Sequence, residues 1–226
     1  DKLQGEIIRE GAKDDEVWVK LTPAKDLPRG PVEITVANAV GESGKLKLHV
    51  DDLPQLVETG VEGAEQLSSL PAGFWGTFDP AGETDEIEFD AQAGQTLVFD
   101  IASKSLGSKA SVHTTLLDPS GRELLSSSGE SGSGEPLLTH AVTTTGRHKV
   151  RLQDLLLGGS KDHFYRLSVG VLPVVRGFFP LSVRAGTETE VELIGYNLPA
   201  ERNVKVKAEK PGAIDLPLDQ SAFRSR

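Results

Sequence analysis

Carboxylates are frequent between residues 58 and 100, and the chemistry they could perform together is the binding of a hard cation. Three glutamates precede a long series of predicted strands, and three further candidates lie within that series: Glu58, Glu62 and Glu65, then Glu83, Asp85 and Asp100. Calcium prefers clustered oxygen ligands of this kind. An acidic stretch between domains is more often simply solvated, so we predict no metal-ligating residue and leave calcium as the one cofactor to test.

The histidines and serines do not form a catalytic pattern. A serine nucleophile needs a nearby base and an orienting acid, but no Gly-x-Ser-x-Gly elbow occurs, and the serines of residues 126–133 lie in a Gly-rich loop. With no cysteine and no His-Glu-x-x-His motif, zinc has no ligand set. Each histidine stands singly in a predicted strand, which favours a sheet position over a catalytic role: His49, His113, His140, His148 and His163. We therefore predict no catalytic or cofactor-binding residue and no enzyme activity.

One Gly-rich segment, residues 41–45, has a superficial likeness to a phosphate-binding loop. The Walker spacing requires a glycine five residues before the Gly-Lys pair and Ser or Thr after it. Ala39 and Leu46 occupy those two places. We interpret the segment as a hairpin turn.

The composition excludes several classes of partner. The 226 residues carry a formal charge of −10 and no basic cluster, which argues against nucleic acid or an anionic membrane as the main partner. No run approaches the roughly 18 apolar residues of a membrane span, so we predict no membrane insertion. The chain begins at Asp1, contains no Met and has no signal peptide, so we expect a processed or excised piece of a larger protein.

Apolar and polar residues alternate with a period of two along most of the chain, which predicts strands with one buried face. Residues 1–50 contain strand–turn–strand units, and residues 51–72 break the pattern and are interpreted as a linker. Residues 73–172 hold roughly eight strands and no helix-length amphipathic stretch, which predicts an antiparallel β-sandwich or jelly roll. Residues 173–226 hold only two or three strands, too few to close a core. The fold class is therefore all-β.

The central series carries six short motifs in a fixed order. They are Gly76-Thr77-Phe78, Asp85-Glu86-Ile87-Glu88-Phe89, Ala93-Gly94-Gln95 before an apolar strand, Leu117-Asp118-Pro119-Ser120-Gly121, the strand from Gly146 to Leu152, and Tyr165-Arg166-Leu167-Ser168-Val169. In this order the segment resembles the pre-peptidase C-terminal (PPC) domain, a small β-sandwich of secreted bacterial peptidases and large surface proteins. The resemblance implies a non-catalytic domain and an extracytoplasmic location.

The two flanks resemble immunoglobulin-like modules of the IPT/TIG type. Residues 181–198, with Gly186, Val191, Leu193, Gly195 and Asn197, look like the opening of such a module, and residues 28–50 look like its closing half. The domain order is similar to that of large extracytoplasmic proteins of planctomycete-type bacteria. We expect each half-module to expose strand edges that pair with neighbouring domains or protein chains.

The PPC resemblance also bears on calcium. Some PPC domains, notably those of collagenases, bind calcium through an acidic segment ahead of the first strand. Here the frequent Glu-x-Asn-Asp lead-in of the family is replaced by Glu58-Thr59-Gly60-Val61-Glu62, without an Asn-Asp pair. This departure favours a solvated linker over a calcium site.

Three functions remain in competition. The leading interpretation is a structural or interaction module that acts as a spacer or assembly domain of a larger secreted or surface protein. The alternative is a glycan- or substrate-targeting module attached to a secreted enzyme, but aromatics make up only 5% of the chain, and outward positions are expected only for Trp18, Trp75 and Phe164. An enzyme is the third and least favoured interpretation, because no polar cluster converges in the sequence.

Overall fold

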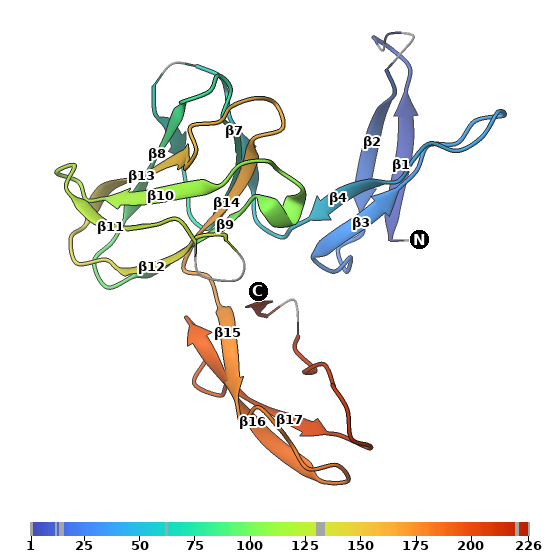
Figure 1. Ribbon diagram of the computed structural model, residues 1–226, viewed down its shortest axis with the longest axis vertical. Coiled ribbons are helices and arrows are strands. Elements are labelled where there is room, and N and C mark those ends of the chain that lie inside the picture. The colour runs from blue at the N-terminus through green and yellow to red at the C-terminus, as the bar shows by residue number, and fades with distance from the viewer. Residues whose placement is uncertain are drawn as a thin grey trace. The chain divides into compact units, whose positions relative to one another are not determined.

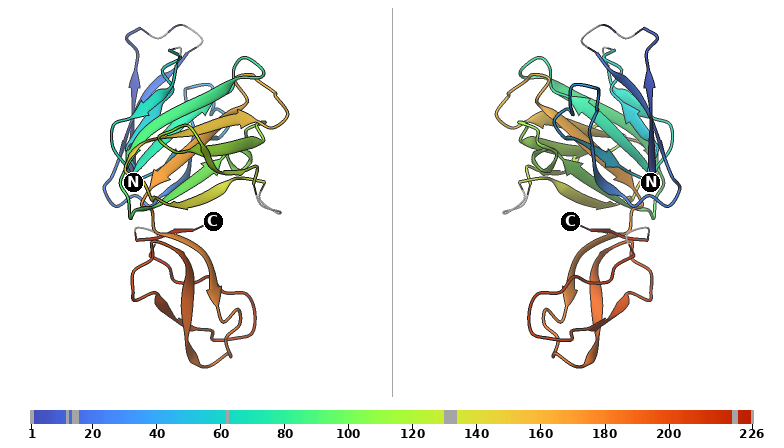
Figure 2. Two further views of the ribbon diagram at one scale, coloured as in Figure 1. Left: turned by 90° about the vertical axis from the view of Figure 1, so that its left-hand side faces the viewer. Right: turned by 90° about the vertical axis from the view of Figure 1, so that its right-hand side faces the viewer.

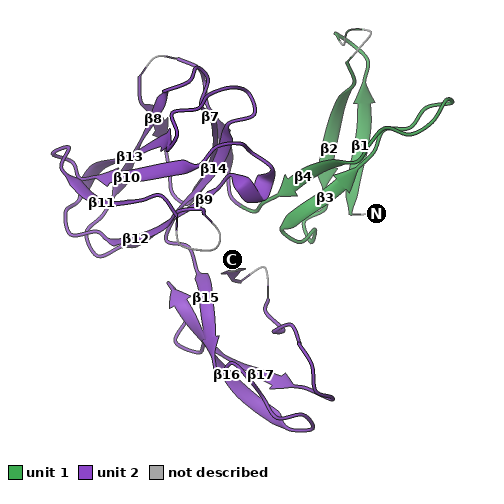
Figure 3. Ribbon diagram, viewed as in Figure 1, with its two compact units in different colours: residues 1–52 green, residues 53–226 purple. Residues whose placement is uncertain are grey.

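The computed structural model describes residues 2–11, 13, 16–61, 63–129, 134–219 and 222–225 (Figure 1). Almost all of its regular structure is β-strand, with one short 3-10 helix, η1 (Lys104–Leu106). The chain divides into two compact units, residues 1–52 and residues 53–226 (Figure 3). The all-β prediction is confirmed. Among the described residues, no helix is long and apolar enough to cross a membrane.

The larger unit contains a sandwich of two five-stranded sheets that enclose one core (Figure 1, Figure 2). The first sheet has the spatial order β11 (Glu123–Ser127), β10 (Val112–Leu117), β13 (Gly146–Asp154), β8 (Thr84–Ala91) and β6 (Glu65–Leu67). The second has the order β12 (Leu137–Ala141), β9 (Thr96–Ala102), β14 (Phe164–Gly170), β7 (Ala72–Thr77) and β5 (Gln55–Val57).

Alternate residues of these strands build the core. Phe74, Phe89, Phe99 and Tyr165 are each at most 2% exposed, and the Tyr165 ring stacks on Phe78 at a centroid distance of 4.9 Å. Burying a large apolar side chain contributes on the order of 1.5–3 kcal/mol. Burial of the apolar side chains at alternate strand positions is therefore the main source of stability of this unit.

The segment interpreted as a linker, residues 51–72, also contributes structure to the sandwich. Strand β5 pairs in parallel with β7, and strand β6 pairs in parallel with β8, so each adds an edge strand to a different sheet. Leu67 of β6 is part of the hydrophobic core, and Leu56 of β5 packs against it. Each strand is three residues long, which is too short for alternation to stand out in the sequence.

A smaller sheet follows the sandwich within the same unit. It has the order β17 (Asn203–Lys207), β16 (Glu188–Tyr196), β15 (Val174–Phe179) and β18 (Arg224–Ser225). Val174 packs with Val98 of the sandwich, and the Asn197 side chain donates hydrogen bonds to the carbonyls of Thr96 and Leu172, both at 3.0 Å. These contacts attach the C-terminal module, residues 173–226, to the end of β14.

Residues 1–52 form two hairpins. Strand β1 (Leu3–Ile8) pairs with β2 (Trp18–Pro23), and β3 (Gly30–Ile34) pairs with β4 (Leu46–Val50), in both cases antiparallel. None of the described residues of this unit is fully buried. The hairpin turn expected at residues 41–45 lies in the connection between β3 and β4, where Ala37 forms an isolated bridge with Glu42.

Candidate functional site

Three of the six candidate carboxylates meet at one end of the sandwich. Oxygen atoms of Glu58, Glu83 and Asp85 all lie within 4.8 Å of one another. They line a cavity of about 430 Å³ to which Glu65 also contributes. We call these four residues and their cavity the acidic pocket. Their burial is intermediate, so solvent reaches the pocket while the protein fixes the carboxylates.

Backbone geometry places Glu58 and Glu83. The Glu58 amide donates to the Trp75 carbonyl at 2.9 Å and continues the β5–β7 ladder, while its carboxylate accepts from the Thr77 amide at 2.7 Å. Glu83 closes the turn between β7 and β8, where its carboxylate accepts from the Asp79 amide at 2.5 Å. Both carboxylates are thus held by backbone donors of the sandwich, at the end of β7 and in the turn that follows it.

Asp85 is placed by the core itself. The Tyr165 hydroxyl donates to Asp85 Oδ2 at 2.7 Å, and the Tyr165 ring is fully buried. This arrangement requires glycine at position 76, the cross-strand neighbour of Tyr165, because a Cβ there would overlap the Tyr165 hydroxyl. Two PPC-like sequence motifs, around Gly76 and Tyr165, therefore combine to present one carboxylate to the pocket.

The charge of the acidic pocket is not balanced by a cation of the protein. Among the ion pairs of the described residues, none involves any of the four pocket carboxylates. Glu86, on the other face of β8, shows the contrast, because it pairs with Lys149 and Arg151, each at 2.7 Å. A hydrogen bond from Lys149 is the largest cause that lowers the pKa of Glu86.

The acidic pocket raises the pKa of its carboxyls instead. Burial raises the pKa of Asp85 to about 7, against the lowering effect of the Tyr165 hydrogen bond, and the charges of Glu58, Glu83 and Glu65 raise it further. Burial likewise raises the pKa of Glu58, with Glu83 and Glu65 adding to the effect. The folded protein thus holds in Asp85 a carboxyl that resists ionisation near neutral pH unless a cation compensates it, and the pKa of Glu58 is shifted in the same direction.

The remaining candidate carboxylates, Glu62, Glu65 and Asp100, are not part of the cluster of three. Glu62 lies outside the described residues. Glu65 accepts hydrogen bonds from the Thr59 amide at 2.6 Å and the Thr59 hydroxyl at 2.7 Å, so it shapes the loop that borders the pocket. Asp100 lies on β9 opposite Leu137 and Ser168, away from the pocket.

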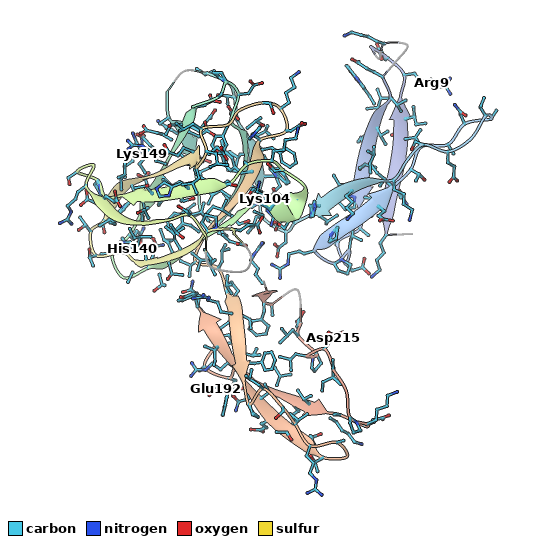
Figure 4. All side chains as sticks on the ribbon, in the orientation of Figure 1. Arg9, Lys104, His140, Lys149, Glu192 and Asp215 are labelled. Carbon is cyan, nitrogen blue, oxygen red and sulfur yellow. The ribbon has the colours of Figure 1, made fainter. Side chains whose placement is uncertain are left out.

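The five histidines lie in different strands or loops, and His140 and His148 lie close to each other. His49 lies on β4, His113 on β10 beside Ser128 at 2.8 Å, and His140 on β12 (Figure 4), with its Nε2 atom buried and without a hydrogen-bond partner. His148 on β13 is buried, and its ring lies 6.5 Å from that of His140 between centroids. Of these, His113, His140 and His148 share no hydrogen bond with a carboxylate of the described residues, a contact that a catalytic triad requires of its base.

His163 comes nearest to a catalytic arrangement. Its Nδ1 atom lies 2.8 Å from the Ser160 hydroxyl. The nearby Asp154 carboxylate is committed elsewhere, because it accepts the amides of Ser111, Leu156 and Gly158 at 2.6, 3.1 and 2.8 Å. The Ser160–His163 contact therefore closes a turn, and among the described residues no carboxylate accepts a hydrogen bond from the imidazole. Residues 130–133 of the serine loop lie outside the described residues.

The candidate aromatic residues do not form a platform. Trp75 donates through Nε1 to Gln55 at 2.9 Å, and the Arg166 guanidinium lies 6.0 Å from its ring centroid, so one face of the ring is occupied. Phe164, at the start of β14, is half-buried. Trp18 is 47% exposed but belongs to the other unit.

The chain has weak likenesses to solved structures, among them a collagenase domain and a lysozyme inhibitor. No protein-family profile matches the chain, and no curated protein matches it. Half of the chain aligns with the whole pre-peptidase C-terminal domain of a Bacillus anthracis collagenase, at 15% identity and a TM-score of 0.40. A periplasmic inhibitor of g-type lysozyme from Aeromonas hydrophila aligns with 54% of the chain over 98% of its own length, at 17% identity and a TM-score of 0.33. At these TM-scores neither likeness defines a family or a function for this chain.

Proposed function

We propose that this chain is a non-catalytic structural module of a larger extracytoplasmic bacterial protein. We further propose that calcium bound in the acidic pocket attaches residues 53–67, which we call the lead-in segment, to the rest of the sandwich. The observation that carries the proposal is the meeting of Glu58, from the lead-in segment, with Glu83 and Asp85, from the sandwich, within 4.8 Å. Glu58 belongs to a different segment of the chain from Glu83 and Asp85, yet all three line one cavity. The expectation of a solvated linker is the competing account.

The donor set suits calcium better than a transition metal. All candidate ligands are carboxylate oxygens, the ligand type that hard cations select, and the described pocket offers no imidazole. Each of Glu58, Glu83 and Asp85 uses one oxygen to accept a hydrogen bond from the protein, which leaves the other for a cation. Water would complete the coordination shell, as is usual for calcium.

Calcium would act here as a structural cross-link. Residues 53–67 are attached to the sandwich through two three-residue strands, so the attachment has few hydrogen bonds of its own. A cation bound by carboxylates of both the lead-in segment and the sandwich stabilises the state in which the two are packed together. It also removes the repulsion between those carboxylates. The direction of the chain as it enters the sandwich would then depend on calcium, which suits a spacer in a multidomain protein.

Thermal melting of the full chain with calcium, magnesium and chelator tests this proposal. At ten times the dissociation constant, calcium should stabilise the protein by about 1.4 kcal/mol. Extracellular calcium modules bind with dissociation constants of about 0.1–1 mM, so 10 mM calcium is a suitable concentration. Equal melting temperatures in calcium and in chelator would refute the calcium part and favour the solvated linker.

The partners proposed for this module are neighbouring domains or protein chains. The described residues of the two N-terminal hairpins bury none of their apolar side chains, and Ile7, Val17 and Leu46 are each more than half exposed. Isolated two-stranded hairpins are marginally stable in water, so we propose that an adjoining domain covers them. Glycan targeting has less support, because Trp75 is occupied by Arg166 and Gln55.

A further inference from the structure

An apolar residue, Val98, is buried on the outer face of the second sheet of the sandwich. Its neighbours on β9, Leu97 and Phe99, belong to the sandwich core, so the alternation of the strand directs Val98 to the opposite face. Val98 is nevertheless fully buried, and it forms a second, separate apolar cluster. The members of that cluster, which we call the joint, are Leu53, Val98, Leu137, Leu172, Val174 and Tyr196.

The joint lies where the chain enters and leaves the sandwich. Strand β5 begins at Gln55, which pairs with Gly73 of β7, and Gly73 pairs on its other side with Ser168, near the end of β14. Only β7 separates β5 from β14, so the entry and the exit lie at the same end of the sheet, roughly 10 Å apart. Leu53 precedes β5 and Leu172 follows β14. One apolar cluster therefore contacts both the entering and the leaving chain.

Hydrogen bonds hold the entering chain against the sheet. The Gly73 amide donates to the Pro54 carbonyl at 2.8 Å, which extends the pairing of β5 with β7 towards the joint. The Gln55 side chain donates through Nε2 to the Leu53 carbonyl at 3.0 Å and accepts from the Trp75 indole at 2.9 Å. These contacts set the backbone of Leu53, so its side chain is presented to the joint by the lead-in segment.

Asn197 holds the C-terminal module on the other side of the joint. Its side-chain amide donates to the carbonyls of Thr96 and Leu172, both at 3.0 Å, and its φ of 51° lies in the left-handed region that asparagine tolerates better than most residues. Gly195 leaves no room for a Cβ against the Val174 carbonyl, so β16 approaches the start of β15 closely. Two directed hydrogen bonds added to an apolar contact fix the angle of the module as well as its position.

We propose that the joint holds the C-terminal module at a fixed angle to the sandwich, and that Leu53 of the lead-in segment closes it. The lead-in segment, the sandwich and the module each contribute to the cluster, so release of the lead-in segment exposes Val98 and Val174 to water and loosens the module. The spacer is therefore stiff while the lead-in segment is packed and bends when it is released. This mechanism goes beyond the proposed function and does not require calcium.

The width of a distance distribution between two spin labels tests the joint. The chain has no cysteine, so Lys161→Cys on the sandwich and Glu201→Cys on the C-terminal module give one labelled pair at exposed positions. Double electron–electron resonance of the full chain in chelator should give one narrow distribution. Leu53→Ser, which opens the apolar cluster, should at least double its width. Asn197→Gly should do the same, because glycine keeps the left-handed backbone but cannot donate the two hydrogen bonds.

Val57→Ser is the matched control, because Val57 belongs to the same lead-in segment but is 71% exposed and lies outside the joint. It should leave the width unchanged. Circular dichroism checks that every variant keeps the β fold, and Leu53→Ala replaces Leu53→Ser if the serine variant does not. A broad distribution without these substitutions, an unchanged width in the Leu53 or Asn197 variant, or equal broadening in the control would overturn the proposal. Because the labels are measured in chelator, these outcomes are separate from any failure of calcium binding.

Discussion

Asp85 gives the sharpest single-residue prediction of the acidic pocket. Replacing it by Asn removes one negative charge while the side-chain carbonyl can still accept the hydrogen bond of the Tyr165 hydroxyl, which the carboxylate accepts at 2.7 Å. Without calcium, we expect Asp85→Asn to be more stable than the wild type at pH 8. In calcium, we expect the variant to have lost the stabilisation that the wild type gains.

The magnitude follows from the pKa of the group. Burial raises the pKa of Asp85 from 3.8 to about 7. Above that pH the folded protein must hold an ionised carboxylate that the unfolded chain ionises more easily, so stability falls as the pH rises from about 4 to 7. A shift of about three units sets a ceiling of roughly 4 kcal/mol. Because solvent reaches the carboxylate, we expect about 1–2 kcal/mol, or roughly 2–8 °C in melting temperature.

Thermal melts of both proteins between pH 4 and 8, in chelator and in calcium, measure these effects. The wild type should lose stability with rising pH in chelator, and the variant should lose less. Asp90→Asn is the matched control, since Asp90 lies on the same strand, is exposed and pairs with Arg147 outside the pocket. Parallel pH profiles for wild type and Asp85→Asn would refute the electrostatic account of the pocket.

Two further predictions concern the core. Burial and the nearby His148 lower the pKa of His140, so the folded state binds fewer protons than the unfolded chain, and stability is lost as the pH falls below about 6.5. His140→Leu should reduce this loss of stability at acid pH, measured by urea titrations. An unchanged pH dependence would contradict the assignment to His140. Gly76→Ala should cost about 1–3 kcal/mol by forcing Tyr165 aside. Gly73→Ala should cost less in the same titrations, because its added Cβ meets only the movable Gln55 side chain, and equal costs would be evidence against the Tyr165 contact.

The sequence predicted the fold where alternation was long enough to read. The strand expected from Gly146 to Leu152 lies within β13, Gly146–Asp154, and the motif from Tyr165 to Val169 lies within β14, Phe164–Gly170. Strands β5 and β6 were missed because three residues cannot establish a period. Strand β15 was missed because its apolar residues do not alternate over Val174–Phe179.

The acidic pocket was predictable in its residue types but not in its membership. Glu58, Glu83 and Asp85 were candidates together with Glu62, Glu65 and Asp100, and chain order alone could not separate them. Their meeting depends on the parallel addition of β5 to β7, which carries Glu58 to the β7–β8 turn. Such a pairing of distant strands has no local sequence signal, and the absence of an Asn-Asp pair after Glu58 favours a solvated linker when the sequence is taken alone. The joint was missed for a similar reason, since its apolar residues come from separate segments of the chain.

Isothermal titration of the full chain with calcium at pH 6.5, below the pKa of about 7 of Asp85 and after chelator treatment, tests the central proposal most directly. The account predicts saturable binding with proton release, because calcium displaces the proton that the raised pKa of Asp85 retains. Repeating the titration in buffers of different ionisation enthalpy measures that proton. Absence of saturable binding, or binding that survives in Asp85→Asn with the same affinity, would contradict the account.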